Sequence, residues 1–314
     1  MESALKRVRN SQPYRVVAHG LSHFCQKLSR LVENDRWVVL DRSGHGPLQL
    51  VDLARDLARC DLAYTWGGRI SMGKFLWASR VLGKRKIVML WSGSDVLFAQ
   101  KEFAAGARSP WVAEMVHWAV SPWIADEVRA LGLPCEYVQA SFVNVVPQPQ
   151  PLPKKFSVLV FVGHVEKADL YGWDRILEVV QRLPRIEFHL CGLPEGQSLV
   201  GPASIKLHNW MSDVSPLLEQ TTVVYRPVRH DGLSFMVLEA LSHGRHVLYS
   251  YPLPGCFHVT TASMACEHLE MLRERHEAGT LDLNEQGRNY IAREYAPEKV
   301  RSELLRRWEQ IILS

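Results

Sequence analysis

Two carboxylates, Asp231 and Glu239, have the residue type and spacing that most clearly suggest chemistry. They lie eight residues apart in the stretch 221–250, which reads TTVVYRPVRHDGLSFMVLEALSHGRHVLYS. Each carboxylate offers two acceptor oxygens, a geometry that suits the neighbouring hydroxyls of a bound ligand. The pair therefore marks a candidate binding site for a polyhydroxylated molecule.

The residues around this acid pair predict a βαβ unit. A β-branched run at 221–225 is stopped by Pro227 and predicts a buried parallel strand. Helix formers follow over 235–243, between Ser234 as a candidate N-cap and Gly244 as a candidate C′ residue. A second strand follows over 246–250. Because open α/β sheets bind ligands beyond the carboxyl ends of their strands, the loop that holds Asp231 is well placed for a site.

This order of features resembles the E-x7-E signature of GT-B glycosyltransferases of the family-4 type, also called glycosyltransferase group 1. Retaining enzymes of that family bind a nucleotide sugar at this position. In this chain Asp231 stands for the first Glu, Glu239 for the second and Gly244 for the glycine that closes the helix. A D-x7-E spacing alone arises by chance. The surrounding strand, loop, capped helix and strand make the resemblance specific.

The resemblance implies a role for each matching residue. Glu239 would accept hydrogen bonds from the nucleotide ribose, and Asp231 would hold hydroxyls of the donor sugar at the catalytic centre. The backbone N–H groups at the start of the helix would stabilise the leaving diphosphate, since helix N-termini bind anions. Asn209-Trp210-Met211 stands where the family contacts the nucleobase. The donor-binding residues implied by this part of the chain are Glu239, Gly232, Leu233, Ser234 and Trp210.

The cations that such relatives carry are only partly present. An Arg and a Lys usually follow the first strand of the second domain, and here His164 stands at the Arg position and Lys167 at the Lys position. Both are predicted to bind the donor. Another cation near the acid pair could replace the missing Arg, and the candidates are Arg226, Arg229 and His230, with Arg229 included among the donor-binding predictions. Each could equally be a solvated surface cation.

The first half of the chain carries the predicted acceptor side. The family often has His-Gly-x-Asp after the fourth strand, and this chain has Ser92-Gly93-Ser94-Asp95, with Ser92 in place of the His. Asp95 is predicted to bind the acceptor or to act as a general base, with a local turn as the alternative. His19 and Gly20, after the first predicted strand, complete the acceptor-side set.

The alternation of strands and helices predicts two domains of α/β class. We expect a GT-B architecture, with two Rossmann-like doubly wound parallel-sheet domains facing across a cleft, over 1–147 on the acceptor side and 148–314 on the nucleotide-sugar side. The segment 145–155 has four prolines in eleven residues and predicts an interdomain hinge. Helical pieces are expected over 111–118 with a strand at the Ala119 end, and two helices are expected at the end of the chain.

The composition and the missing motifs argue against several other classes of protein. The six cysteines form no C-x-x-C pair, which argues against a zinc site, and no metal or other cofactor is expected. No nucleic-acid-binding motif is present. Gly44-His45-Gly46 is half of a dinucleotide fingerprint, but Gln49 stands where the third glycine belongs. A nicotinamide site is therefore a weak alternative.

The sequence thus predicts a metal-independent glycosyltransferase, retaining by resemblance, that moves a sugar from a nucleotide-sugar donor to a glycan or lipid-linked acceptor. One alternative is a catalytically weak relative that binds a sugar nucleotide or forms part of a complex, and a GT-B epimerase is a third reading. Without an apolar signal or membrane span, a cytoplasmic location is expected.

Contact with the inner face of the membrane is a further prediction. Residues 1–145 hold 19 Lys and Arg against 13 Asp and Glu, so the positive charge is concentrated in the first half. Four tryptophans lie in the same half, and tryptophan is common both in cores and at membrane interfaces. They are Trp77, Trp111, Trp118 and Trp123.

Overall fold

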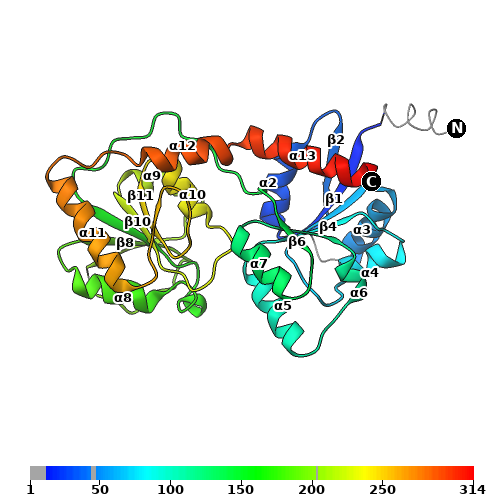
Figure 1. Ribbon diagram of the computed structural model, residues 1–314, viewed down its shortest axis with the longest axis horizontal. Helices are drawn as coiled ribbons and strands as arrows, with labels where there is room; N and C mark the ends of the chain where they lie inside the picture. Colours follow the sequence, from blue (N-terminus) through cyan, green and yellow to red (C-terminus); the bar gives the residue numbers. More distant parts are fainter. Residues whose placement is uncertain (1–11, 44–46, 203) are drawn as a thin grey trace. The chain divides into compact units, whose positions relative to one another are not determined.

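The computed structural model describes residues 12–43, 47–202 and 204–314, and the chain divides into two compact units. The first unit runs to Ser141 and is completed by Pro297–Ser314, while the second unit is Phe142–Ala296. Each unit has a parallel sheet with helices on both of its faces (Figure 1). The predicted α/β class with two doubly wound sheets is confirmed.

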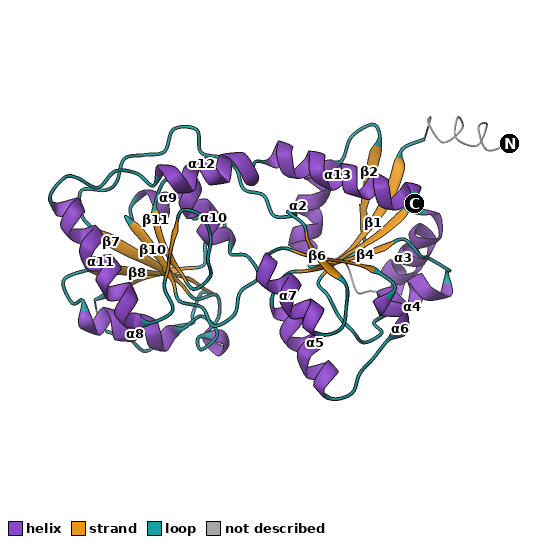
Figure 2. Cartoon of the chain, viewed as in Figure 1, coloured by secondary structure: helices purple, strands orange, loops and turns teal. Residues whose placement is uncertain are grey.

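The first unit contains six parallel strands in the order β2-β1-β3-β4-β5-β6 (Figure 2). Because β1 lies between β2 and β3, the order changes direction between β1 and β3. This is the topological switch point of the sheet. The strands are β1 (Tyr14–Gly20), β2 (Trp37–Asp41), β3 (Leu62–Trp66), β4 (Ile87–Trp91), β5 (Val116–Ala119) and β6 (Cys135–Tyr137).

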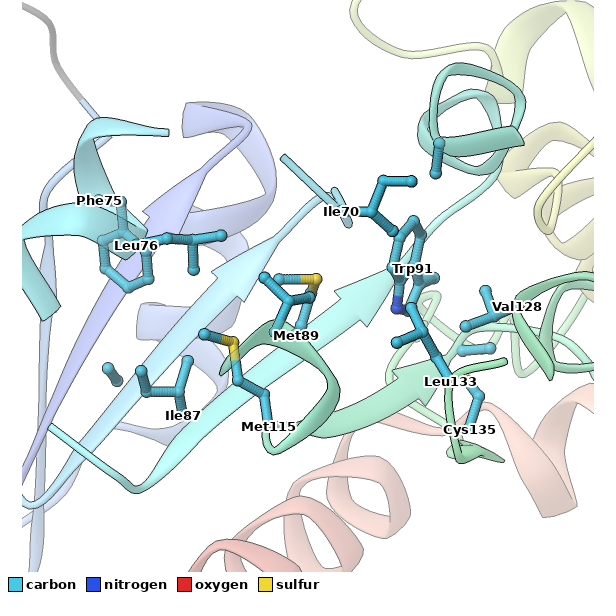
Figure 3. Packing of buried hydrophobic residues seen from close by; sticks show 14 of the residues in the cluster. Ile70, Phe75, Leu76, Ile87, Met89, Trp91, Met115, Val128, Leu133 and Cys135 are labelled. Atoms are coloured by element: carbon cyan, nitrogen blue, oxygen red, sulfur yellow. The ribbon is translucent and has the colours of Figure 1, made fainter. Parts of the chain in front are cut away.

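Side-chain alternation along β4 shows how this sheet is buried on both faces. Ile87, Met89 and Trp91 point to the face where Phe75 and Leu76 also pack (Figure 3), and the intervening residues of β4 point to the opposite face. All five residues of β4 are buried, as expected for a strand covered on both sides. The helices are α2 (Ser22–Val32), α3 (Pro47–Arg59), α4 (Lys74–Val81), α5 (Ser94–Ala104), α6 (Pro110–Ala113), α7 (Pro122–Ala130) and α13 (Pro297–Leu313).

The last helix, α13, belongs to the first unit, whereas the sequence assigned it to the second domain. It packs against α2 and β3. Its fully buried Trp308 lies with its ring centroid 5.4 Å from that of Tyr64 and 5.8 Å from that of Trp37. The physical reason for the difference is this aromatic cluster, because its partners lie about 250 residues earlier and no local pattern reveals them.

The second unit also contains six parallel strands, in the order β12-β11-β10-β7-β8-β9. Its switch point lies between β7 and β10. The strands are β7 (Ser157–Phe161), β8 (Glu187–Leu193), β9 (Ile205–Asn209), β10 (Val223–Arg226), β11 (His246–Tyr249) and β12 (Cys256–His258). The helices are η1 (Val165–Lys167), α8 (Trp173–Arg182), α9 (Ser215–Glu219), α10 (Phe235–Ser242), α11 (Ala262–Glu277) and α12 (Glu285–Glu294).

One predicted boundary is displaced, because the strand expected at the Ala119 end already begins at Val116. The helical pieces expected over 111–118 are a single turn, α6, followed by strand β5. Ser109 caps α6 through its hydroxyl, which accepts from the Val112 N–H, and Pro110 starts the helix. A four-residue apolar strand cannot be told from a helical segment by periodicity, which explains the error. The half fingerprint Gly44-His45-Gly46 lies outside the described residues. Within the described chain, no helix is long and apolar enough to span a bilayer.

The proline-rich segment 145–155 lies along the second unit and is bonded to it. Fully buried Arg245 donates from Nη1 to the Pro151 carbonyl at 3.2 Å and from Nη2 to the Gln150 carbonyl at 3.0 Å. His276 Nε2 bonds the Pro153 carbonyl at 2.7 Å. Prolines lack the N–H group that a strand ladder needs, so the segment does not pair as a strand, and these two side chains bond its carbonyls instead.

We expect Arg245→Ala to lower the free energy of unfolding by about 3 kcal/mol, because two charge-assisted hydrogen bonds are lost at once. Urea unfolding of the full chain measures the change. Arg185→Ala is the matched control, since Arg185 is exposed in the same unit. If the two variants unfolded at the same urea concentration, Arg245 would not anchor the segment.

Candidate functional site

A cavity of about 310 Å³ lies in the second unit, at the switch point of its sheet. Phe161 ends β7 and Arg226 ends β10, the two strands between which the strand order reverses. Such a position is where open α/β sheets bind ligands. The cavity is lined by Phe161, Met211, Ser212, Asp213, Val214, Arg226, Asp231, Leu233, Ser234, Phe235, Met236 and Glu239.

A buried ion pair forms the polar centre of this cavity. Arg226 is 8% exposed, and its Nε donates to Asp231 Oδ2 at 2.8 Å. Burial lowers the pKa of the Arg226 guanidinium, but the charge of Asp231 and its hydrogen bond outweigh burial and raise it. The cation is therefore held in its charged form inside the wall of the cavity.

Two tyrosines also hold Asp231. The Tyr249 hydroxyl donates to Asp231 Oδ2 at 3.1 Å, and the Asp231 N–H donates to the Tyr251 hydroxyl at 3.2 Å. Burial and the Asp231 charge raise the pKa of Tyr249 well above its usual value, so this hydroxyl stays protonated and can donate. Arg226 and Tyr249, from two strands, thus hold the Asp231 carboxylate, and Tyr251 holds its backbone.

Arg226 still has donor capacity beyond this pair. Its guanidinium carbon lies 5.5 Å from the ring centroid of Phe161 and 5.4 Å from that of Tyr171, distances typical of cation–π contacts. Its Nη1 atom is buried and has no hydrogen-bond partner among the described residues. An unpaired charged donor of this kind is costly unless a ligand satisfies it.

Helix α10 brings the second acid and an N-terminus to the same cavity. The Ser234 hydroxyl accepts from the Val237 N–H at 3.4 Å, so Ser234 is the N-cap that the sequence predicts. Glu239 lies one turn into the helix and lines the cavity, as do Leu233 and Ser234. Gly232 is buried in the loop between Asp231 and these residues. The structure therefore brings together both predicted acids and the predicted helix start.

The remaining predicted donor-binding cations lie elsewhere. Arg229 forms a two-point ion pair with Asp174, with both N–O distances at 2.8 Å, and does not line the cavity. His164 precedes the short helix η1 and Lys167 ends it, and neither lines the cavity. His164 accepts from Gln197 Nε2 at 3.2 Å. Of the cations considered from sequence, Arg226 is the one that the described structure places in the cavity wall.

The Trp210 side chain is mostly exposed, and the Trp210 backbone N–H donates to the Leu193 carbonyl at 2.7 Å. Its side chain does not line the cavity, but the next four residues do, starting with Met211. The loop expected near the nucleobase is therefore beside the cavity, with Met211 rather than Trp210 facing it.

A second cavity, of about 750 Å³, lies in the first unit at the switch point between β1 and β3. It is lined by all four predicted acceptor-side residues, His19, Gly20, Ser92 and Asp95. His19 stacks on Phe75 with ring centroids 4.6 Å apart. Gly20 has φ +126°, and a Cβ atom there would lie 1.9 Å from the Trp66 carbonyl oxygen, so only glycine fits.

Asp95 has a clear role in holding the loops of this cavity. Its Oδ2 accepts from the Gly68 N–H at 2.6 Å and the Ser92 N–H at 3.0 Å, and its Oδ1 accepts from the Gly93 N–H at 2.7 Å and the Val96 N–H at 3.1 Å. Burial raises the pKa of Asp95, while these four N–H groups act in the opposite direction. A general base needs a lone pair aimed at its substrate. Here both carboxylate oxygens of Asp95 already accept hydrogen bonds from backbone N–H groups.

No group of three or more His, Cys, Asp or Glu in the described part of the chain is arranged to hold a metal ion. All six cysteines are free, and burial raises the pKa of the Cys25 thiol to about 11.

Sequence reasoning missed the aromatic residues around the ion pair. Tyr171 precedes α8, whereas Tyr249 and Tyr251 lie at the end of β11 and just after it, and each looks like an ordinary apolar residue in its own context. A usable signal was present at Arg226, because a charged residue at the end of an otherwise apolar strand needs a partner once it is buried.

Comparison with known families assigns the segment that contains this cavity. Residues 157–265 match the model described as glycosyl transferases group 1. The match begins at the first residue of β7 and includes both Asp231 and Glu239. No curated protein sequence matches the chain significantly.

Solved structures match over nearly the whole chain. A glycosyltransferase from Rickettsia africae has a TM-score of 0.68 at 10% identity, covering 96% of this chain and 99% of its own. Anabaena HepE in complex with UDP and glucose has a TM-score of 0.67 at 11% identity, covering 95% and 99%. Sucrose-phosphate synthase from Thermosynechococcus elongatus has a TM-score of 0.64 at 11% identity, covering 95% and 99%.

These comparisons confirm the GT-B fold, and they identify the segment 157–265 as a glycosyltransferase group 1 domain.

We expect Arg226→Met to lower the free energy of unfolding by about 3 kcal/mol, because it leaves the Asp231 carboxylate without its cation. Asp231→Asn should also be destabilising. The double variant should lose clearly less than the sum of the two single losses, since the second change removes a group already left unpaired. Urea unfolding of all four proteins measures this coupling, and additive losses would show that the ion pair contributes nothing to stability.

Proposed function

We propose that the chain transfers a sugar from a nucleotide-sugar donor, bound in the second unit, to a hydroxyl of a glycan or lipid-linked acceptor. The observation that carries the proposal is the switch-point cavity, where Arg226, Asp231, Glu239 and the start of α10 meet. A nucleoside diphosphate sugar has a diol, a diphosphate and a polyhydroxylated ring, and this cavity offers a matching group for each.

The leaving diphosphate gains negative charge as the bond to the sugar breaks. In the proposed mechanism that charge is neutralised by the N-terminus of α10 and by Arg226, whose Nη1 is buried and unpaired within the described chain. Helix N-terminal N–H groups bind phosphates well, and preorganised donors of this kind contribute strongly to catalysis. No metal is needed for this step, so metal independence remains our proposal.

Glu239 and Asp231 are then assigned to the two ends of the donor, the nucleotide and the sugar. We assign Glu239 to the ribose hydroxyls, because it lines the cavity inside the first turns of α10. Asp231 is assigned to the sugar, because Arg226 and Tyr249 fix its Oδ2 and thereby orient the carboxylate. Retention of configuration is proposed on the resemblance of this acid pair to the E-x7-E signature.

The proposal does not assign the nucleobase of the donor, and uracil is the first candidate to test. The Anabaena HepE structures contain UDP, UDP with glucose, or UDP-glucose. This likeness supports the choice of UDP-sugars as probes. The location in the cytoplasm stays a prediction.

A second candidate function is a nucleotide-binding relative with weak or no turnover. It is favoured by Asp95, whose oxygens are engaged by backbone N–H groups, and by Ser92 at the position where the family often has His. Nucleotide binding without sugar transfer to any offered acceptor would favour this candidate over the first.

We expect Glu239→Gln to weaken binding of a nucleoside diphosphate by at least about tenfold, since one lost charged hydrogen bond costs about 1.5 kcal/mol or more. Calorimetric titration with UDP, GDP and ADP measures the affinity. Glu270→Gln, at an exposed position of α11, is the matched control. Equal affinity in the two variants, or no nucleotide binding by the unmodified chain, would contradict the proposal.

A separate experiment tests the diphosphate role of Arg226. Arg226→Lys keeps a positive charge opposite Asp231 but removes the Nη1 donor. We expect about tenfold weaker binding of the nucleoside diphosphate and little change for the corresponding monophosphate. If binding of the diphosphate and of the monophosphate weakened equally, Arg226 would act by holding the loop in place and not by binding the second phosphate.

A further inference from the structure

Helix α4 of the first unit has an apolar face that the described chain leaves uncovered. Trp77 is 62% exposed and Val81 is 63% exposed, and Leu82 directly after the helix is 38% exposed. Trp77 and Val81 lie four positions apart, so they share one side of the helix. The opposite side, with Phe75, Leu76 and Ser79, is buried in the unit. A large exposed Trp beside two aliphatic side chains usually marks an interaction surface.

The charge around this face has a single sign. Between Asp61 and Asp95 the chain has six Lys and Arg residues and no carboxylate. Three of these cations, Lys74, Arg80 and Arg85, are exposed on α4 and directly after it. They border the apolar side chains, so the surface combines hydrophobic contact with attraction for anions.

The same surface contains a polar hollow of about 330 Å³ next to the end of α4. Arg80, Lys84 and Arg85 line it together with Trp111 and a single acid, Glu114. The Arg80 guanidinium carbon lies 6.0 Å from the Trp111 ring centroid, and Lys84 Nζ donates to the Cys60 carbonyl at 2.7 Å. Three cations around one hollow of this size provide a site for an anionic headgroup.

We propose that this surface docks the protein on an anionic lipid bilayer. Trp77, Val81 and Leu82 enter the boundary between headgroups and acyl chains, while Lys74, Arg80 and Arg85 lie at the level of the lipid phosphates. Tryptophan favours that boundary, and long basic side chains reach from an apolar contact to the headgroups. Each Lys or Arg near an anionic membrane contributes about 1 kcal/mol.

The docking surface is continuous with the cavity of the first unit. Lys74, Phe75 and Leu76 in the first turn of α4 line that cavity. Three exposed apolar side chains, Leu21, Met72 and Phe98, also line it. An amphiphilic acceptor at the bilayer surface would therefore meet an apolar cavity rim beside the docked helix. This extension to a lipid-linked acceptor rests on the proposed function, whereas the docking itself does not.

Vesicle flotation of the full chain tests the docking. Vesicles of phosphatidylcholine alone are compared with vesicles containing 30% phosphatidylglycerol, roughly the anionic fraction at which surface attraction is strong. We expect flotation with the anionic vesicles, decreasing as salt rises because the Debye length shortens. Trp77→Ser/Val81→Ser should reduce binding by about tenfold or more, and Arg80→Glu/Arg85→Glu should do so as well.

The matched control for the apolar change is Trp210→Ser/Val200→Ser, which removes a Trp and a Val that are 64% and 93% exposed in the second unit. Lys154→Glu/Arg185→Glu is the control for charge reversal, since both residues are exposed there. We expect both controls to float like the unmodified chain. Thermal unfolding checks that every variant folds.

Several results would overturn the docking proposal. They are no flotation of the unmodified chain, equal flotation with both vesicle types, or losses no larger in the α4 variants than in the controls. Binding of RNA at the same surface in place of vesicles would also overturn it. Because nucleotide titration measures the second unit separately, failure of the docking can be told apart from failure of the proposed function.

Discussion

The site in the second unit depends on one buried ion pair. Arg226 ends a central strand where the apolar environment would exclude a lone cation, and Asp231 makes its charge tolerable. The same bond fixes the loop between β10 and α10, because Asp231 sits in its middle. Once the loop is fixed, the start of α10 and Glu239 face the same cavity. Without Asp231, the buried Arg226 guanidinium would lose its counter-charge.

Close packing of a neighbouring loop supports this arrangement. Gly172, at the start of α8, has φ +71°, and a Cβ atom there would lie 2.0 Å from the Pro227 carbonyl oxygen. The Arg229 N–H donates to the Leu170 carbonyl at 2.9 Å, and the Arg229 side chain is held by Asp174. Arg229 thus anchors the loop from outside while Arg226 faces the cavity. A cation on a strand end is also positioned more rigidly than one on a loop.

Both units place a cavity at the point where the strand order reverses, but the two cavities differ in chemistry. In the second unit the wall contains a cation, two acids and a helix start, which suits a phosphorylated and hydroxylated ligand. In the first unit the carboxylate of Asp95 is engaged by the backbone, and exposed apolar side chains line the cavity. Sheet topology therefore fixes where ligands can bind in each unit, and side chains decide which ligand each cavity suits.

The sequence by itself determined the α/β class, most element positions and the acid pair, because strands, caps and turns leave local patterns. The two strands predicted over 221–225 and 246–250 correspond to β10 and β11, and Ser234 caps α10 as expected. Only the tertiary structure decided that α13 joins the first unit, that β5 begins at Val116, and that Arg226 rather than His164 or Lys167 faces the cavity. These outcomes depend on contacts between residues far apart in the chain, such as Trp308 with Tyr64 and Arg226 with Tyr171. Local pattern carries no information about such contacts, since they arise when the sheet assembles.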